Sequence, residues 1–336
     1  MIISKVPEYR HSMVFRGLLV LLEHLGYNSF YVQMRTGMFR WDKGEFRMKK
    51  TGIVTDSHSG ISQEEAERLG IYVLPMPFYM NDVCYYEGIN ITREEFLERL
   101  SRLENISTSQ PSPESVMELW DKALLNYEDI LYIPISSGLS GSCQTAMMLS
   151  REEKYEGRVY VVDNGSVATP LHQSILDALE LLEQGCSAAE VKERMERVKT
   201  KAGIYIAVDD LKYLKHGGRI SAGVALVGGL LNVKPVLHFD IGILELHKNC
   251  RGLKRAKQTM IDDVKKVIED SYQDEYHAGN VHIVAASSAG KEETDAWVKE
   301  IEAAFPGRTI LCDDLSFGVT CHIGPGGLGI GYSLKP

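Results

Sequence analysis

The chain has 336 residues, of which 44% are hydrophobic, and a formal net charge of −9. This length allows two domains, and the acidic balance argues against nucleic-acid binding because a negative body repels phosphate backbones. The six cysteines are scattered without any C-x-x-C pair, a pattern typical of reduced thiols rather than of a disulfide framework or a zinc site. The longest uncharged apolar run near the start, residues 17–22, is too short to cross a bilayer. We therefore expect a cytoplasmic protein without a metal, a cofactor or an integral membrane segment.

Residues 1–47 differ from the remainder of the chain. They are aromatic and carry a net charge of +3, whereas the remainder carries −12, and they lack a clear alternation of strands and helices. Three interpretations stay open. The translation start could be assigned too far upstream, with Met48 as the natural start; residues 12–25 could form an amphipathic appendage that contacts a partner or a membrane; or the segment could be an extra packed element. We assign no function to it.

From residue 52 onward, short apolar runs alternate with helical patterns. Ser62 and Ser112 are expected to cap helices, and Thr92-Arg-Glu-Glu95 has the form of a capping box. Strands are expected at 52–55, 130–135 and 159–162, an extended segment at 71–77, and helices at 62–69, 92–100, 113–125 and about 142–150. This alternation predicts a parallel sheet with helices on both faces.

The second half of the chain has a different order of predicted strands and helices. We expect a helical stretch at about 168–200, strands at 204–208, 233–239 and 281–286, a hairpin return arm at 241–246, helices at about 252–270 and 291–304, and Gly-rich extended segments at 309–312 and 319–333. This pattern predicts a mixed α/β domain that begins between residues 165 and 205. The fold class is therefore α/β with two domains, over 48–165 and 166–336, and a ligand site between them.

Polar side chains follow several of the predicted parallel strands, where ligands of such sheets usually bind. Asp56 and Ser57 follow the first strand, and the run Ser-Ser-Gly-Leu-Ser-Gly-Ser over 136–142 follows a later one and opens a helix. Its backbone N–H groups and the helix dipole favour an anion, Gly141 permits a close approach, and Ser140 offers a hydroxyl. The alternative is that Ser140 or Ser142 only caps the helix.

Three other loops carry candidate binding residues. Thr108 and Ser109 precede Gln-Pro-Ser-Pro, Arg219 ends a His-Gly-Gly-Arg run, and His322 lies before a Gly-rich stretch. Each loop taken alone is compatible with plain turn, cap or helix-end chemistry. Together they predict a pocket that holds an anionic head group mainly with neutral donors. The alternative function is an acyl hydrolase with Ser140 as nucleophile and His322 as base, although a G-x-S-x-G elbow and an orienting carboxylate are missing.

In this order and spacing, these motifs resemble the DegV family of bacterial fatty-acid-binding proteins from about residue 48 to the C-terminus. The matching segments are Val-Thr-Asp-Ser at 54–57, Thr-Ser-Gln-Pro-Ser-Pro at 108–113, Ser-Ser-Gly-Leu-Ser-Gly at 136–141, Asp-Leu-Lys-Tyr-Leu-Lys-His-Gly-Gly-Arg-Ile at 210–220, Asn-Val-Lys-Pro at 232–235, Arg-Gly-Leu-Lys-Arg at 251–255 and His-Ile-Gly-Pro-Gly at 322–326. The chain departs from the family at Ser142-Cys143, where Thr-Tyr is usual, and at Asn164, where Ser is usual.

The resemblance implies one long-chain fatty acid held between two α/β domains, with no other cofactor. It implies that Thr108 and Ser140 hold the carboxylate, with Ser109 and Gly141 beside them, and that His322 and Arg219 lie near the head group or on a surface offered to a partner, as Asp56 and Ser57 would. That partner would be an ATP-dependent fatty acid kinase that makes acyl phosphate for phospholipid synthesis. The chain has no G-x-x-x-x-G-K-[ST] loop, so we expect a lipid-binding subunit rather than an enzyme.

Overall fold

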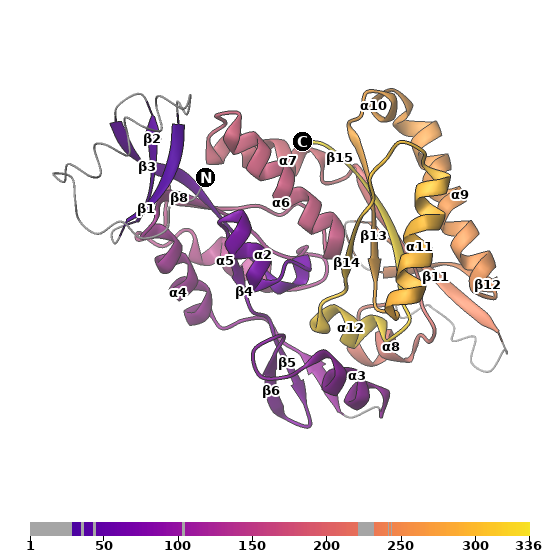
Figure 1. Ribbon diagram of the computed structural model, residues 1–336. Coiled ribbons are helices and arrows are strands. Elements are labelled where there is room, and N and C mark those ends of the chain that lie inside the picture. Colours follow the sequence, from indigo (N-terminus) through magenta and orange to yellow (C-terminus); the bar gives the residue numbers. More distant parts are fainter. Residues whose placement is uncertain are drawn as a thin grey trace.

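The protein folds into two α/β domains, each built on a six-stranded sheet (Figure 1). The structure is a computed structural model that describes residues 29–34, 37–42, 45–102, 105–220, 232–240, 242 and 244–336. The predicted two-domain α/β class is confirmed.

The core of the first domain is a parallel sheet. In spatial order its strands are β4 (Tyr72–Leu74), β3 (Glu45–Asp56), β8 (Tyr127–Ile133) and β9 (Val159–Val161). The helices of one face are α4 (Pro113–Leu124) and α5 (Ser142–Leu149); those of the other face are α2 (Gln63–Leu69), α6 (Ala168–Glu183) and α7 (Ala188–Val198). Helices thus cover both faces, as the alternating pattern predicts. The helical stretch expected at 168–200 is two helices, because Gly185 adopts a left-handed φ of 94° between them.

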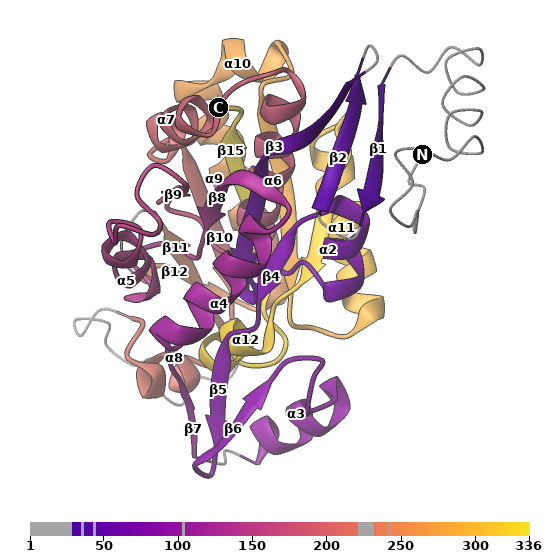
Figure 2. The ribbon, with the colours of Figure 1, turned by 90° about the vertical axis from the view of Figure 1, so that its left-hand side faces the viewer.

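An antiparallel hairpin extends this sheet beyond the parallel core (Figure 2). It consists of β1 (Ser29–Met34) and β2 (Gly37–Asp42), and β2 pairs with the first half of β3. The strand expected at 52–55 therefore begins at residue 45, and Met48 lies inside it, opposite Phe39. Residues 29–34 and 37–42, which show no clear alternation of strands and helices in the sequence, form this hairpin. The proposed appendage at 12–25 lies outside the described residues.

The first domain also carries a small three-stranded sheet, which was not predicted from the sequence. Its strands are β5 (Pro77–Met80), β6 (Val83–Tyr86) and β7 (Ile106–Thr108), and α3 (Arg93–Ser101) packs on it. The Thr92 hydroxyl accepts the Glu95 N–H, as expected of a cap. This small sheet lies beside α12 (Phe317–Ile323) of the second domain, where Phe96 stacks on Phe317 at 4.3 Å between ring centroids.

A half-buried carboxylate reinforces the contact between the small sheet and α12. Glu87 accepts a hydrogen bond of 2.9 Å from the backbone N–H of Phe317, at the start of the helix. Burial raises the pKa of Glu87 to about 7. Nearby, Arg93 forms an ion pair of 3.1 Å with Asp314. These bonds join the two domains at the end of the molecule that carries α12.

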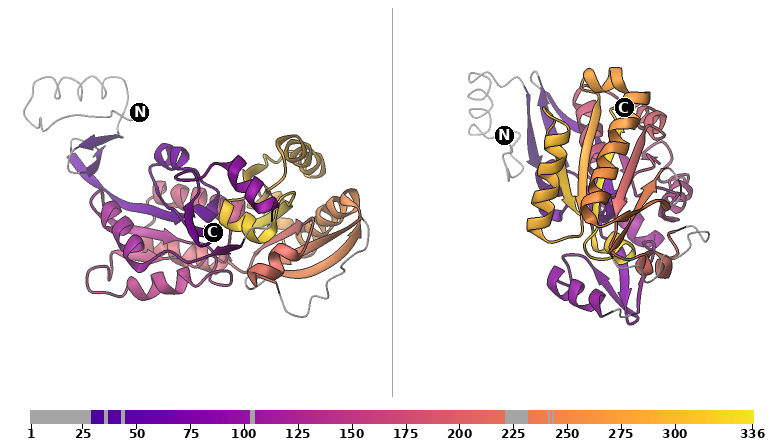
Figure 3. Two further views of the ribbon diagram at one scale, coloured as in Figure 1. Left: turned by 90° about the horizontal axis from the view of Figure 1, so that it is seen from below. Right: turned by 90° about the vertical axis from the view of Figure 1, so that its right-hand side faces the viewer.

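The second domain is a mixed sheet. In spatial order its strands are β12 (Leu244–Arg251), β11 (Val233–Phe239), β10 (Ala202–Ala207), β15 (Leu328–Leu334), β13 (Val281–Ser287) and β14 (Leu311–Asp314). The outer face is covered by α9 (Leu253–Ser271) and α11 (Lys291–Ala304), with α10 (Gln273–His277) at one end (Figure 3). The inner face turns toward the first domain. The expected hairpin is present, but its return strand begins at residue 244 and continues to 251.

The expectation of an extended segment over 319–333 is wrong at its start, where α12 forms instead. The Ser316 hydroxyl accepts the Val319 N–H and caps this helix, and Gly324 ends it with a φ of 80°. The Gly-rich composition concealed a helix of seven residues that is stabilised by its cap and by packing of Phe317. His322 therefore lies on the last turn of a helix rather than in a turn. Extended structure resumes with β15.

Candidate binding site

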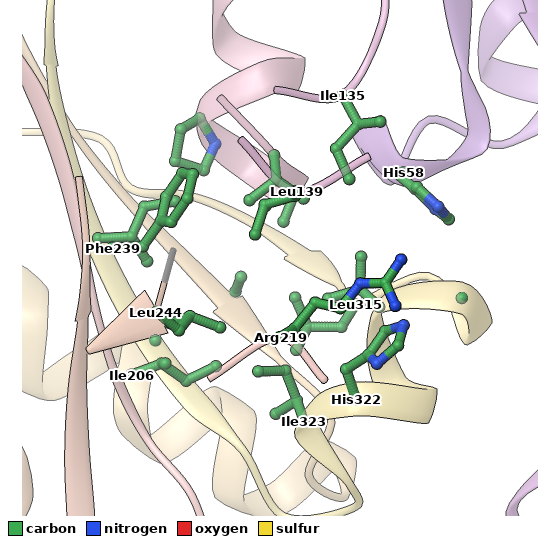
Figure 4. Close-up of a pocket in the computed structure, with 18 of the residues that line it drawn as sticks. His58, Ile135, Leu139, Ile206, Arg219, Phe239, Leu244, Leu315, His322 and Ile323 are labelled. Atoms are coloured by element: carbon green, nitrogen blue, oxygen red, sulfur yellow. The ribbon is translucent and has the colours of Figure 1, made fainter. Parts of the chain in front are cut away.

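A cavity of about 360 Å³ lies between the inner face of the second sheet and the first domain (Figure 4). The strand residues that face it alternate with residues that pack beneath α9 and α11, as the two-residue period of a strand requires. Most of its wall is apolar: Ile135, Leu139, Val167, Ile204, Ile206, Phe239, Leu244, Leu315 and Ile323. The wall is suited to a hydrocarbon chain.

One end of the cavity is polar. His58, Arg219 and His322 lie there, opposite the end that carries Phe239 and Leu244 (Figure 4). The cavity is also lined by Thr108, Ser109, Ser140 and Gly141. The fold thus gathers, from four separate loops and helix ends, the six residues Thr108, Ser109, Ser140, Gly141, Arg219 and His322 that the sequence singled out.

Thr108 and His322 form the central pair of the polar end. The Thr108 hydroxyl lies 2.8 Å from Nε2 of His322, while Nδ1 of His322 is buried without a hydrogen-bond partner among the described residues. Gly217, at the end of α8 (Lys212–Gly217), lets this helix approach closely, because a Cβ there would overlap the His322 ring. Burial and then the charge of Arg219 lower the pKa of His322 to about 3. The imidazole is therefore neutral near pH 7.

His58 is a site residue that the sequence analysis missed. It lies in the short helix η1 (Ser57–Ser59) after β3, and its Nδ1 is 3.2 Å from the Ser316 hydroxyl. Burial, followed by the charge of Arg219, lowers the pKa of His58 to about 4. Gly318 makes room for this ring, since a Cβ there would overlap it. The signal was its position directly after Asp56 and Ser57, at the carboxyl end of a parallel strand.

Arg219 brings a positive charge to the polar end. Its guanidinium lies between the His58 and His322 rings (Figure 4), and one N–H donates 2.7 Å to the Gly217 carbonyl. No carboxylate forms an ion pair with it within the described ranges. Because the two histidines are neutral, Arg219 is the one charged side chain among the described residues that line the cavity. The head group would therefore meet one cation as well as the neutral donors expected.

Ser140 lines the cavity just before α5. Its oxygen accepts the N–H of Ser142, the first residue of that helix, at 3.2 Å. The N-cap is Gly141, however, and no side chain caps the helix, so the alternative that Ser140 or Ser142 is its cap is wrong. The bond to Ser142 uses a lone pair of Ser140, so the hydroxyl proton can still be donated to a ligand.

Asp56 and Ser57 do not join the polar end. The Asp56 carboxylate is buried and accepts the backbone N–H groups of His58 at 3.0 Å and Ile135 at 2.8 Å, and burial raises its pKa to about 6. It ties the end of β3 to the loop after β8 and so positions two cavity residues. The Ser57 hydroxyl accepts the Met76 N–H at 3.1 Å and faces a separate cleft.

The geometry does not resemble a hydrolase triad. His322 is hydrogen-bonded to Thr108 rather than to Ser140, and in the described part of the chain no carboxylate contacts its Nδ1. The described residues hold no group of three or more His, Cys, Asp or Glu side chains suited to a metal ion. Among the described helices, none combines the length and apolar character needed to cross a membrane.

Comparison with known proteins places this architecture in a family. Residues 50–335 match a family described as "uncharacterised protein, DegV family". A DegV domain-containing protein from Deinococcus radiodurans is 30% identical over 285 residues, which are 84% of this chain and 98% of that protein. A DegV family protein from Thermus thermophilus, described for its fatty acid binding, is 30% identical, with a TM-score of 0.75 over 85% of this chain and 99% of the other. A stearic-acid-binding protein from Eubacterium ventriosum is 25% identical, with a TM-score of 0.74 over 85% and 98%.

Proposed function

The chain belongs to the DegV family, and from that premise we propose that it binds one long-chain fatty acid in the cavity between its domains. The observation that carries the proposal is the polarity of the cavity: an apolar wall leads to one end with hydroxyls, neutral imidazoles and Arg219. The Thermus and Eubacterium proteins, which share the fold, are described as binding a fatty acid and stearic acid, respectively.

The carboxylate is held by the hydroxyls of Thr108 and Ser140. The partnerless Nδ1 of His322 supports this assignment, because a buried N–H without an acceptor is less favourable than a buried lone pair. The ring proton then resides on Nε2 and is donated to Thr108, which leaves the Thr108 hydroxyl proton for the ligand. Arg219 offsets the negative charge of the carboxylate. His322 thus acts as a positioning residue for Thr108.

The tail supplies most of the affinity. About 14 buried methylenes at ~0.8 kcal/mol each contribute roughly 11 kcal/mol before ordering costs. Two hydrogen bonds from hydroxyls to a carboxylate add about 1.5–3 kcal/mol each. The head-group donors therefore mainly fix the position of the carboxylate rather than determine whether the lipid binds.

The second part of the proposal is presentation of the bound acid to an ATP-dependent fatty acid kinase, which forms acyl phosphate for lipid metabolism. Attack on a γ-phosphate requires a carboxylate that is fixed in place yet still carries its charge, and hydroxyl donors meet both needs. The absence of a phosphate-binding loop motif from the sequence supports a separate source of ATP chemistry. In this arrangement the chain works as a lipid-binding subunit.

The decisive experiment is native mass measurement of the purified protein, followed by denaturing lipid extraction and identification of the fatty acids. We expect one long-chain fatty acid per chain. A cavity that is empty on purification and stays empty after incubation with palmitate or oleate would refute the proposal. Addition of candidate kinases and ATP to the loaded protein then tests presentation through the appearance of acyl phosphate.

A further inference from the structure

The central strand of the second sheet presents two glycines to the cavity. β15 lies between β10 and β13, and Gly329 and Gly331 lie on its inner face and line the cavity; Gly327, directly before the strand, continues the row toward α12. Gly327 lies next to Ile323 of α12, near the polar end, and Gly331 lies next to Pro170 at the start of α6. At ~3.3 Å per residue this row runs roughly 13 Å from the head-group end into the cavity.

Packing explains the glycines at the two ends of the row. A Cβ on residue 327 would lie 2.6 Å from Cγ2 of Ile323, and a Cβ on residue 331 would lie 3.0 Å from Cγ of Pro170. Any side chain at either position would displace a neighbour. These two glycines are therefore needed for close packing in the protein itself.

Neither packing nor backbone conformation explains Gly329. It lies in regular pairing with Ile206 on one side and Ala286 on the other, and its φ is not in the left-handed region. A Cβ there would meet only the carbonyl oxygens of Ala286 and Tyr205, at 3.5 Å each, and Cδ1 of Ile206 at 3.8 Å, which are ordinary contacts. Glycine inside a strand weakens it relative to alanine, so this position carries a cost to the fold that no neighbour requires.

We propose that Gly329 is the residue that lets the acyl tail pass beyond the middle of the cavity, and so sets the chain length the protein accepts. This inference rests on the proposed function. Residue 329 lies halfway along the row, and the walls beside it are Ile206 and the small Ala286. A tail with its carboxylate near Thr108 must cross residue 329 to reach the far end. A side chain there would occupy the space of the tail without disturbing the protein.

Adding a side chain at residue 329 should therefore leave the protein as stable or more stable, while it weakens the binding of long fatty acids. Gly329→Ala should leave the delipidated protein as stable as wild type or raise its Tm by about 1–3 °C, since alanine restores strand propensity without a clash. Gly331→Ala is the matched control on the same face of the same strand, and it should lower the Tm because of Pro170. A fall in the Tm of Gly329→Ala that equals the control's would show that packing requires this glycine, and would overturn the inference.

The test of chain length uses delipidated wild type and Gly329→Leu, titrated with saturated fatty acids of increasing length. In wild type, each added methylene should tighten Kd about fourfold until the cavity is filled. In Gly329→Leu the tightening should stop once the tail reaches residue 329, so the two proteins diverge by about fourfold for every further methylene. Parallel series in the two proteins would refute the role of Gly329 and leave the proposed function intact. A wild type that binds none of the acids would refute the proposed function itself. If Gly329→Leu fails to fold, Gly329→Ala is titrated in its place, and an unchanged chain-length optimum would refute the inference.

Discussion

Replacing Thr108 by valine tests how much the hydrogen bond between Thr108 and His322 stabilises the fold. The substitution keeps the shape of the side chain and removes the hydroxyl that lies 2.8 Å from Nε2 of His322. Since Nδ1 of His322 already lacks a partner among the described residues, both ring nitrogens would then be unpaired. Leaving a buried polar group unsatisfied costs about 1–3 kcal/mol, and this is the expected loss in free energy of unfolding.

The same variant should affect lipid binding less than its position suggests. It removes one of the two proposed donors to the carboxylate, worth about 1.5–3 kcal/mol, whereas burial of the proposed fatty-acid tail contributes roughly 11 kcal/mol. The affinity should therefore fall by about one to two orders of magnitude, with long-chain acids still bound. Thr108→Ser, which keeps the hydroxyl, is the matched control and should behave like wild type in both assays.

Urea unfolding of delipidated protein, monitored by circular dichroism, measures the first effect, and titration with palmitate measures the second. A midpoint for Thr108→Val equal to that of wild type, with the same slope, would show that the Thr108–His322 bond contributes nothing to the fold. Complete loss of palmitate binding would refute the conclusion that the tail dominates affinity.

Three further predictions concern charge and reactivity. Ser140→Ala should keep most of the bound fatty acid yet lose most phosphoryl transfer by the proposed partner kinase; transfer at the wild-type rate would refute the proposed role of Ser140 as a hydrogen-bond donor to the carboxylate. The pKa of Glu87 is raised to about 7 in the folded state, from 4.5 in the unfolded state. The free energy of unfolding therefore falls as the pH rises from about 4.5 through 7, and the total loss is about 3 kcal/mol. Glu87→Gln should thus raise the Tm at pH 8 and change it little at pH 4.5; equal effects at both would contradict this. Arg219→Met should raise the pKa of His322, measured by imidazole NMR, because it removes a nearby positive charge; an unchanged value would exclude that coupling.

Local signals in the sequence account for the elements that were predicted correctly. Ser62 and Ser112 cap their helices through hydroxyl bonds to the third residue beyond, as the cap pattern indicates. The parallel strands of the first domain are short, buried apolar runs that stop at polar residues. These features are encoded within a few neighbouring residues, so one sequence is enough to find them.

The missed elements depend on partners far away in the chain. β5 and β7 pair although more than twenty residues separate them, and β7 has the Ser/Thr-rich composition of a loop. The helix that carries His322 is short, contains Gly318 and ends at Gly324, and Phe96 from the other domain packs against it. His58 was missed because its role arises from burial beside Arg219, which only the folded chain creates.

The place of β15 in the second sheet has a consequence for how the protein acquires its activity. This strand is the last in chain order, yet it lies at the centre of the sheet, between β10 and β13. Until it inserts, the β10–β12 meander and the β13–β14 pair have no common neighbour, and the floor of the cavity does not exist. Such long-range pairing forms late and slowly. The cavity that we propose for a lipid therefore cannot form before β15 inserts, and its ability to bind a ligand should appear together with the completed second sheet.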